Sequence, residues 1–533
     1  MSKVDVRDVD LALPDAEEFQ VAMTPDVRDR IWHWLHGDGA ARAPERGVMC
    51  VLTRSPGTRR LTYLIREVVP PEPGEVDLSG GVEFSRTYRR RVKRRADEAS
   101  GGVLYLHTHP YGEGRPSRQD VVRGRRLLHN DAQHLGHQNP PLAIGILTPD
   151  ENWMVLGCEY PQGTSVSEGK ARYATAIRLV GKRFRKLRTY AGVDDITGAA
   201  GPIGRVDPEK QDRQLRLWTR EAQEMYAGLR VGIVGLGGGG SILAEHVARA
   251  GVAELVLIDY DVIKKENLNR QQGASSVDAS VWRPKVDVAA RTARQAATNP
   301  DFTVMRVHGS AVEDDADFSA YRELLDCDVI LHAADGHWTT WVLDEIAHAH
   351  LIPVVSGGTR PGTTDSGVLK ETSKSPITVS GPSHPCFRCV RHHRPDRARE
   401  ERHGEREPGP DYNLGGDGTD DRFDEATGDR ATPESEGTDK EPAPSVISLN
   451  AIVAGLMHLR LQDLTLGITN HVVGEYRFLP GSWDFERGRD RCSEDCDRDD
   501  LVAAGESNVF PLSKDRQFEN TRAEVSRRFT PFW

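Results

Sequence analysis

A buried strand that runs into a glycine-rich turn constrains the fold of this 533-residue chain most strongly. The strand and turn read LRVGIVGLG (residues 229–237), SILAEHVARA (241–250) is typical of a helix, and ELVLID (254–259) is typical of a second buried strand. Two apolar strands joined through a helix form a βαβ unit, which builds parallel sheets covered by helices on both faces. We therefore expect an α/β domain with a doubly wound parallel sheet.

The length of the chain allows two or three domains. Short apolar runs that alternate with turn signals predict a mixed α/β domain over residues 1–190, and the glycine-rich stretch 191–205 is expected to be a linker. The doubly wound domain then takes residues 206–533. Within it, residues 394–444 are rich in charged residues, Gly, Pro and Thr, and we expect a disordered acidic insertion because they cannot bury enough apolar surface.

The overall composition excludes several classes of protein. A formal net charge of −11 argues against broad nucleic-acid binding, which needs a basic surface. No apolar run approaches the roughly 20 residues that span a bilayer, and the start of the chain lacks the apolar core of a secretory signal. The seven cysteines are few for a chain of this length and odd in number, so a disulfide framework is not expected. We expect a cytoplasmic protein without membrane contact.

The first candidate site combines two histidines with a serine and an aspartate. His107 ends the apolar run VLYLH, and His109 follows two residues later. Side chains two apart on a strand share a face, so both imidazoles can point at one ion. Ser117 and Asp120 lie on one side of an expected first helical turn. Two imidazoles and one carboxylate leave a fourth tetrahedral position open, as in a catalytic zinc site. The alternative is that Ser117 and Asp120 are only a capping box and that the histidine pair is incidental.

The whole run HTHPYGEGRPSRQD, residues 107–120, resembles the JAMM signature of the JAB/MPN metalloproteases, which remove ubiquitin or ubiquitin-like proteins. That family also needs a glutamate near the start of an upstream strand. Glu45 in PERGVMCVL holds the matching place, and we prefer it to Glu67 in YLIREVVPPE. The resemblance implies that Glu45 moves the proton of a metal-bound water and that Ser117 helps to stabilise the oxyanion. It also implies a catalytic Zn²⁺ with three protein ligands, His107, His109 and Asp120.

The second candidate site begins at the glycine turn. Glycines allow the backbone to approach phosphates, and the following helix N-terminus supplies positive potential. Asp259 at the end of the next strand suits a ribose hydroxyl. These features alone fit NAD as well as ATP, so a dehydrogenase is the natural alternative. The glycines concerned are Gly235, Gly237, Gly238 and Gly240.

Four polar residues further along favour ATP. Asn267, Arg270 and Lys285 suit a triphosphate better than a neutral nicotinamide, and Asp335 follows a later apolar run, where an acid can hold Mg²⁺. Each residue also has a purely structural alternative. Arg270 and Lys285 could be surface charges, and Asp335 could be a helix cap.

The ordered set of motifs resembles the ThiF/MoeB/ubiquitin-activating superfamily, which adenylates the C-terminal carboxylate of a ubiquitin-fold protein. The resemblance begins at the run DRQL (residues 212–215) and implies a Rossmann-like sheet, with ATP and Mg²⁺ as ligands. It implies that Asp259 binds ribose, that Asp335 holds Mg²⁺ and that Arg213 reaches across a homodimer to the partner's ATP. The phosphates would be bound by Asn267, Arg270 and Lys285.

Two cysteine pairs predict a structural zinc site. Cys386 and Cys389 form a CxxC motif, and Cys492 and Cys496 resemble the second half of this superfamily's zinc site, with three intervening residues in place of two. Four thiolates close a tetrahedral site. No cysteine lies between residues 390 and 491, and Cys327 opens an apolar run typical of core, so we expect no stable thioester on this chain, or transfer to a separate carrier protein.

The two resemblances point to one substrate, the C-terminal tail of a ubiquitin-like protein. The sequence thus predicts a bifunctional enzyme of a ubiquitin-like pathway, with a zinc isopeptidase that matures or deconjugates this partner and an adenylyltransferase that activates it. The first alternative is sulfur-carrier chemistry, in which the adenylate becomes a thiocarboxylate. A scaffold with decayed sites is the other.

Overall fold

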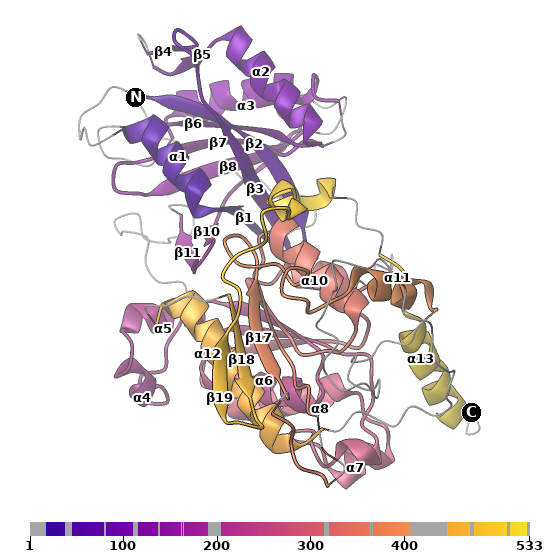
Figure 1. Ribbon diagram of the computed structural model, residues 1–533. Coiled ribbons are helices and arrows are strands. Elements are labelled where there is room, and N and C mark those ends of the chain that lie inside the picture. The colour runs from indigo at the N-terminus through magenta and orange to yellow at the C-terminus, as the bar shows by residue number, and fades with distance from the viewer. Residues whose placement is uncertain are drawn as a thin grey trace.

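The structure is a computed structural model, and it describes residues 17–37, 45–78, 81–109, 116–136, 139–160, 163, 165–189, 204–313, 319–362, 364, 366–371, 373–405, 445–469, 474–508 and 512–529. Most of the predicted linker and residues 406–444 of the predicted insertion lie outside the described residues. Two separate large sheets, each with its own helices, make up the described part (Figure 1).

The N-terminal sheet is mixed and has nine strands. Its order follows from alternating hairpins and crossovers: β2 pairs antiparallel with β3 and β6, whereas β6 pairs parallel with β7. In spatial order the strands are β11 (Phe184–Arg188), β10 (Ala176–Val180), β1 (Glu18–Met23), β3 (Arg60–Val69), β2 (Gly47–Pro56), β6 (Gly102–His107), β7 (Leu142–Leu147), β8 (Trp153–Glu159) and β9 (Lys170–Tyr173). The short strands β4 (Val76–Asp77) and β5 (Glu83–Phe84) form a separate ribbon.

Three helices cover the two faces of this sheet. Helix α1 buries Ile31 and Leu35 in one core, and α2 and α3 contribute Tyr88, Val92 and Leu128 to the core on the opposite face. Each helix begins at a Ser or Thr whose hydroxyl accepts a backbone N–H of the first turn, which satisfies a donor that has no partner within the helix. The helices are α1 (Pro25–His36), α2 (Arg86–Glu98) and α3 (Arg118–Ala132).

The second sheet has eight strands, and its first five are parallel. Its order runs from β14 through β13 and β12 to β15 and β16, so the chain reverses its direction of travel across the sheet between β12 and β15. The last three strands are antiparallel. The strands are β14 (Thr303–Val307), β13 (Glu254–Ile258), β12 (Arg230–Val234), β15 (Val329–His332), β16 (Val354–Gly357), β17 (Ser375–Ser380), β18 (Glu475–Leu479) and β19 (Asp484–Arg487).

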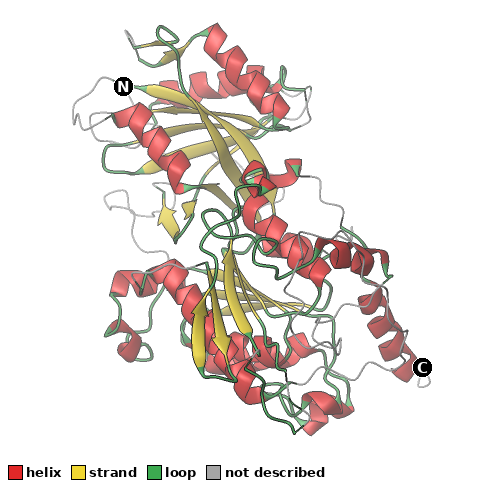
Figure 2. Cartoon of the chain, in the orientation of Figure 1, coloured by secondary structure: helices red, strands yellow, loops and turns green. Residues whose placement is uncertain are grey.

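Helices lie on both faces of the second sheet (Figure 2). Helices α6 (Gly238–Arg249), α8 (Lys285–Ala296) and α12 (Ile447–Leu466) share one core, and α9 (Ala320–Leu325) and α10 (His337–Ala349) share the other. The central parallel strands β12, β13 and β15 are buried on both faces, which explains their largely apolar sequences. The predicted α/β class with a Rossmann-like parallel sheet is confirmed. The shorter helices are α4 (Asp212–Leu215), α5 (Arg220–Ala227), α7 (Ser276–Ser280), α11 (Pro395–His403) and α13 (Arg516–Phe529).

The predicted disordered insertion, residues 394–444, was wrong at its beginning, because residues 395–403 form helix α11. Proline stands in its first turn and Gly404 ends it in the left-handed conformation, at φ 69°. A buried contact stabilises the helix, since the Trp338 backbone N–H donates to Glu401 Oε2 at 2.7 Å. Composition over a long window hid this short helix, which depends on that distant partner.

Buried polar contacts join the two sheets' domains. Asp326, which precedes β15, accepts the backbone N–H groups of Arg59 and Arg60 at 2.9 and 2.8 Å. The Thr53 hydroxyl of β2 donates to the backbone carbonyl of Ala503 at 2.6 Å. Within the described residues, no helix is long and apolar enough to cross a membrane.

Candidate active sites

The predicted histidine and aspartate ligands lie together at one end of the N-terminal sheet. His107 ends β6, His109 follows two residues later, and Asp120 lies in the first turn of α3. The Nε2 atoms of the two histidines are 3.1 Å apart, and the Asp120 carboxylate oxygens lie 3.8 Å from His107 and 3.5 Å from His109. One donor atom from each residue falls within 4.8 Å of the others. Two imidazoles and a carboxylate this close fit the donor set of Zn²⁺.

The capping role considered for Ser117 and Asp120 is present in the structure. The Asp120 backbone N–H donates to Ser117 Oγ at 3.1 Å, and the Ser117 backbone N–H donates to Asp120 Oδ2 at 2.7 Å. This reciprocal pair starts α3 and also orients the Asp120 carboxylate towards the histidines. Capping and metal binding are therefore compatible here, and Ser117 remains exposed beside the cluster.

The pKa values of the cluster favour the protonation states that a metal needs. Burial lowers the pKa of His107 to about 4, although Asp120 opposes this effect. Burial raises the pKa of Asp120, but hydrogen bonds from His109 and Ser117 and the nearby His107 outweigh it and lower that pKa to about 2. At neutral pH the His107 imidazole is neutral and Asp120 is an anion, the forms in which both bind metal.

Strand register separates the two candidate glutamates. Gly47 of β2 pairs with His107, and the Thr108 N–H donates to the Arg46 carbonyl at 3.0 Å, so Glu45 falls opposite His109. Glu67 on β3 is level with residue 51 of β2, which pairs with residue 103 of β6, about 20 Å along the strand from residue 109. Glu67 forms an ion pair with Arg95 instead. The structure therefore places Glu45 near the cluster and Glu67 away from it.

The glycine turn connects β12 to α6 with little space around it. Gly235 has φ 86°, and a side-chain carbon there would lie 2.6 Å from the Ala334 backbone. A carbon on Gly240 would lie 1.8 Å from the Gly235 carbonyl oxygen, and one on Gly238 would lie 2.2 Å from Asn450 Nδ2. Gly237, by contrast, faces open space. Gly235 and Gly240 are thus required by close contacts with backbone atoms, whereas Gly238 faces the end of a side chain that can move. Gly237 borders the space that a phosphate would need.

Asp259 and Lys285 meet beside this turn. Asp259 Oδ2 accepts the Leu236 backbone N–H at 2.6 Å, so the carboxylate is tied directly to the turn. Lys285 Nζ lies 2.7 Å from Asp261 Oδ2 and 4.0 Å from Asp259 Oδ2. Burial raises the pKa of Asp259, which Lys285 opposes. Burial lowers the pKa of Lys285, but Asp259 and Asp261 outweigh it, so its net pKa is raised and the ammonium stays charged.

Asp335 follows the end of β15 and faces the same region. Its side chain is exposed to solvent, yet burial by surrounding protein raises the pKa of its carboxyl, against the charges of Lys285 and Arg360. Lys285 acts electrostatically on both Asp259 and Asp335, so the three predicted residues share one site.

The remaining phosphate candidates, Asn267 and Arg270, lie in the segment that follows Asp259. Asn267 uses its side-chain oxygen locally, accepting the Lys264 N–H at 2.8 Å in a 3₁₀ turn, Lys265–Asn267. Arg270 lies next to Gly238, since its Cβ would be 3.6 Å from a side-chain carbon there, and its guanidinium donates to the Glu266 carbonyl at 2.6 Å. The contact with Gly238 therefore places Arg270 beside the glycine turn, and local hydrogen bonds hold both residues.

Sequence reasoning missed three residues of this site. Gln271 is buried, and its amide donates to the Leu236 carbonyl at 2.6 Å, a hydrogen bond that stabilises the glycine turn. Asn450 reaches Gly238 from α12, and Arg360 acts electrostatically on Asp335 from beyond the end of β16. Only Arg360 had a local signal in the sequence, since it closely follows the apolar run IPVV of residues 352–355. The other two depend on contacts between distant segments.

Arg213 lies far from the nucleotide turn of its own chain. Its side chain is 91% exposed on α4, where it lies 3.9 Å from the neighbouring carboxylate of Asp212. Helix α4 packs against the C-terminal end of α6, because Gln214 donates to the Ala250 carbonyl at 3.2 Å. The turn lies at the other end of α6, about 18 Å away for a twelve-residue helix. The structure therefore does not bring Arg213 together with the other predicted residues of the nucleotide site.

The four predicted zinc cysteines converge. One sulfur from each lies within 4.8 Å of the others, with Cys386 Sγ 3.7 Å from Cys496 Sγ. Burial raises the pKa of Cys389, but hydrogen bonds from Ser493 and Cys386 outweigh it and lower that pKa to about 7. The extra residue in the second pair does not prevent convergence, and the set fits a closed tetrahedral zinc site. Cys327 is fully buried in the core, as predicted.

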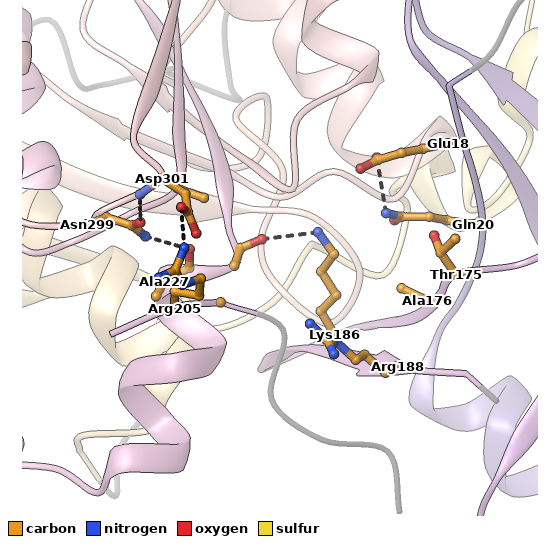
Figure 3. Close-up of a pocket in the computed structure, with 13 residues that line it drawn as sticks. Glu18, Gln20, Thr175, Ala176, Lys186, Arg188, Arg205, Ala227, Asn299 and Asp301 are labelled. Carbon is orange, nitrogen blue, oxygen red and sulfur yellow. Dashed lines mark hydrogen bonds and ion pairs between the residues drawn. The ribbon is translucent and has the colours of Figure 1, made fainter. Parts of the chain in front are cut away.

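A cavity of about 490 Å³ lies between the two domains (Figure 3). Neither the histidine cluster nor the glycine turn lines it. Gln20 and Lys186 line it from the first sheet, and Ala227, Gly228 and Ala253 line it from the second. Residues 227, 228 and 253 precede β12 and β13, so the cavity is at the opposite edge of the sheet from the glycine turn. Its position gives it no part in either candidate reaction.

A family model described as ThiF family matches residues 211–494, more than half of the chain. The chain belongs to the ThiF family. In this ThiF-family protein the match includes the glycine turn, Asp259, Asp335 and the first three zinc cysteines, and Cys496 lies two residues beyond it. The match begins at residue 211, directly before α4, so the whole N-terminal sheet precedes the matched residues.

Curated relatives match this ThiF-family protein over about a third of its length. The SAMP-activating enzyme E1 of Haloferax volcanii is 32% identical over 171 residues, which is 32% of this chain and 56% of that protein. The molybdopterin-synthase adenylyltransferase of Escherichia coli is 32% identical over 178 residues, 33% of this chain and 64% of that protein. The chain thus covers less than two thirds of either relative. A solved structure of E. coli MccB with succinimide has a TM-score of 0.38 and 15% identity, covering 54% of this chain and 73% of that chain.

Proposed function

We propose that the second domain is an ATP-dependent adenylyltransferase that acts on the C-terminal carboxylate of a ubiquitin-fold protein. The observation that carries the proposal is the convergence of the glycine turn, Asp259, Lys285 and Asp335 at the carboxyl ends of β12, β13 and β15. The sheet reverses its winding between β12 and β15, and open α/β sheets bind nucleotides at such a point. The proposed division into residues 1–190, 191–205 and 206–533 follows the two sheets.

The residues suit in-line attack of a carboxylate on the α-phosphate. A carboxylate oxygen forms a bond to the α-phosphorus, the bond from that phosphorus to the bridging oxygen breaks, and pyrophosphate leaves. Asp259 would hold the ribose, and Lys285, Arg270 and Asn267 would neutralise and orient the phosphates. Mg²⁺ held by Asp335 would supply further charge neutralisation.

The identity of the carrier is narrowed by the relatives and by the cysteines. One relative is a molybdopterin-synthase adenylyltransferase, and another, of Aspergillus fumigatus, is an adenylyltransferase and sulfurtransferase. These names favour the sulfur-carrier alternative over a conjugation pathway, and they favour ATP over NAD. No cysteine lies between residues 390 and 491 to carry a thioester, and Cys327 is buried. We therefore propose that no stable thioester forms on this chain. The adenylate would instead be converted to a thiocarboxylate or transferred directly to a separate carrier protein.

A homodimer is part of the proposal. Arg213 is exposed on α4, which packs at the end of α6 opposite to the glycine turn, and this position suits contact with the nucleotide of a partner subunit. The four cysteines would hold a structural Zn²⁺ that fixes β17 and the segment after β19.

ATP–pyrophosphate exchange tests this function. Purified full-length chain is assayed with ubiquitin-fold carriers that end in Gly-Gly, and exchange should require both the carrier and its last glycine. Asp335→Asn should reduce exchange at least tenfold, on the order of one lost charge contact. Asp301→Asn, on an exposed ion pair near the opposite sheet edge, is the matched control. Exchange that continues without a carrier, or that survives Asp335→Asn, contradicts the proposal.

We propose as a second function that the N-terminal domain is a zinc peptidase of the JAB/MPN type. The observation in its favour is the cluster of His107, His109 and Asp120, with Glu45 opposite His109 by register. A bound Zn²⁺ would supply an acidified water and polarise the scissile carbonyl. Glu45 would accept a proton from that water and return it to the leaving amine, and Ser117, exposed beside Asp120, would stabilise the oxyanion.

Cleavage of a linear fusion, a ubiquitin-fold carrier followed by a reporter peptide, tests this function. Glu45→Gln should reduce turnover by about 10² to 10⁴, the usual contribution of a general base. Glu67→Gln changes the same side chain at the site that faces Arg95, and it should leave turnover unchanged. Equal loss in both variants, or no loss in Glu45→Gln, would rule out the assignment of Glu45.

A further inference from the structure

The C-terminal helix α13 packs against the loops that form the nucleotide site. This helix lies after residue 494, beyond the part of the chain that matches the ThiF family. Figure 1 shows it on the outer side of the second domain, below α11. It therefore lies outside the matched part of the chain, next to the residues proposed to bind ATP.

The start of α13 is fixed to the edge of the sheet. Asp515 precedes the helix, and its carboxylate accepts the Gln517 backbone N–H at 3.0 Å, as an N-cap does. The same carboxylate accepts the Ser310 hydroxyl at 2.6 Å, and Ser310 follows edge strand β14. Because β14 neighbours the strand that leads to Asp259, this anchor sets the distance between α13 and the nucleotide loop.

One face of α13 then contacts the loop directly after Asp259. The Tyr260 hydroxyl donates to Gln517 Oε1 at 2.8 Å, and the rings of Tyr260 and Phe518 have centroids 5.8 Å apart. Tyr260 directly follows Asp259, the proposed ribose acid, in the sequence. Its side chain therefore links the nucleotide loop to α13.

The second half of α13 contacts the next segment of the same loop. Glu524 Oε2 lies 3.1 Å from Lys264 Nζ, and Lys264 opens the 3₁₀ turn that contains Asn267. The Arg528 guanidinium lies over the Trp282 ring, 4.4 Å from its centroid, just before the proposed phosphate lysine in the sequence. Contacts spaced by seven and eleven residues from Gln517 fall on one helical face.

We propose that α13 is a positioning element for the nucleotide: its Gln517–Glu524 face holds the loop of residues 259–267 in the shape that binds ribose and phosphates. The inference rests on the proposed ATP function and adds to it a part outside the family domain. A loop held in place before ATP arrives loses less conformational entropy on binding, so α13 raises the affinity for ATP. The helix touches no reacting atom, so the chemical step itself does not depend on it.

The test uses three single variants of the full-length chain and one double variant. Gln517→Ala and Tyr260→Phe each remove one side of the same hydrogen bond, and the double variant measures their coupling. Glu524→Gln removes the ion pair to Lys264. The matched control is Glu519→Gln, the same change on the opposite face of α13, where the carboxylate lies 3.8 Å from exposed Lys514.

The first measurement is the steady-state rate of carrier-dependent ATP–pyrophosphate exchange. Gln517→Ala and Tyr260→Phe should each raise the KM for ATP by about threefold to tenfold, the worth of one net hydrogen bond, with little change in kcat. The double variant should be no worse than the weaker-binding single variant. Glu524→Gln should raise KM by about twofold or less, because the pair is partly exposed.

The second measurement needs no activity. Amide hydrogen exchange without ATP should become faster over residues 259–270 in Gln517→Ala, and should not change in Glu519→Gln. An active parent chain together with unchanged KM and unchanged amide exchange in Gln517→Ala overturns the inference and leaves the proposed function intact. An equal rise in KM in Glu519→Gln overturns it as well, because the contact face would then not matter. A parent chain without any ATP exchange instead refutes the function on which the inference rests.

Discussion

Replacement of Asp328 by asparagine should cost more stability than any surface change, because this carboxylate joins the two domains. Asp328 is fully buried next to β15 of the second domain. Its oxygens lie 2.8 Å from Arg60 Nη1 and 2.9 Å from Lys186 Nζ, and 4.0 Å from Arg178 Nη1, all from the N-terminal domain. Burial raises the pKa of Asp328, but these three cations outweigh it and hold the pKa well below its usual range.

The magnitude follows from what Asp328→Asn leaves behind. The amide keeps the size of the carboxylate, and its oxygen can still accept the Arg230 backbone N–H, which lies 3.0 Å from Asp328 in the parent chain. The buried cations of the N-terminal domain, however, lose their counter-charge. Breaking a buried pair in this way costs about 3–5 kcal/mol. Asp301→Asn is the control, because its partner Arg205 is 73% exposed and such a pair contributes about 0–1 kcal/mol.

Amide hydrogen exchange measures this cost locally, since a chain with two domains need not unfold in one step. The opening free energy of amides in β10 and β15 should fall by about 3–5 kcal/mol in Asp328→Asn and by less than about 1 kcal/mol in Asp301→Asn. The contribution of Asp328 is complete above the unfolded-state pKa of about 3.9 and is lost as the pH falls below it. Equal effects of the two variants at neutral pH would refute the reasoning.

Three further predictions concern the glycine turn, a buried histidine and the cysteines. Gly240→Ala should lower the thermal midpoint and abolish ATP binding, because its side-chain carbon would lie 1.8 Å from a backbone oxygen, whereas Gly239→Ala has open space and should keep or raise the midpoint. Burial lowers the pKa of His350 to about 3, whereas an unfolded-state imidazole has a pKa of about 6.5. As the pH falls below about 6.5, only the unfolded state takes up this proton, which lowers the free energy of unfolding by up to about 1.4 kcal/mol per pH unit. The urea midpoint of His350→Gln should therefore depend less steeply on pH from 6.5 to 4. Cys389→Ser should lose one zinc ion per chain by elemental analysis, and retention of the full zinc content would contradict the four-cysteine site.

The residues at strand ends could be predicted because their signal is local. A continuous apolar strand followed by glycine or aspartate fixes where the chain leaves the sheet, so Gly235, Asp259 and Asp335 were expected together and lie together. The same holds for His107 and His109, since a two-residue spacing at a strand end needs no distant partner.

Residues that depend on distant partners could not be predicted. Asn450 packs under Gly238 from a helix more than 200 positions later, and Glu401 stabilises α11 only because the N-terminus of α10 lies beside it. The contact of Tyr260 with Gln517 likewise joins segments separated by 257 residues. Such pairs leave no periodic pattern in the sequence, because their spacing is set by the order of the strands and helices in space.

The intact mass of the carrier protein tests the central claim most directly. Incubated with the full-length chain, ATP and Mg²⁺, a ubiquitin-fold carrier that ends in Gly-Gly should gain the mass of AMP on its C-terminal glycine, with pyrophosphate released in equal amount. The adduct should form at least tenfold more slowly with Asp335→Asn and should be absent with a carrier that lacks its last glycine. Adenylation of a side chain instead, or an adduct that forms equally well in Asp335→Asn, would contradict the account.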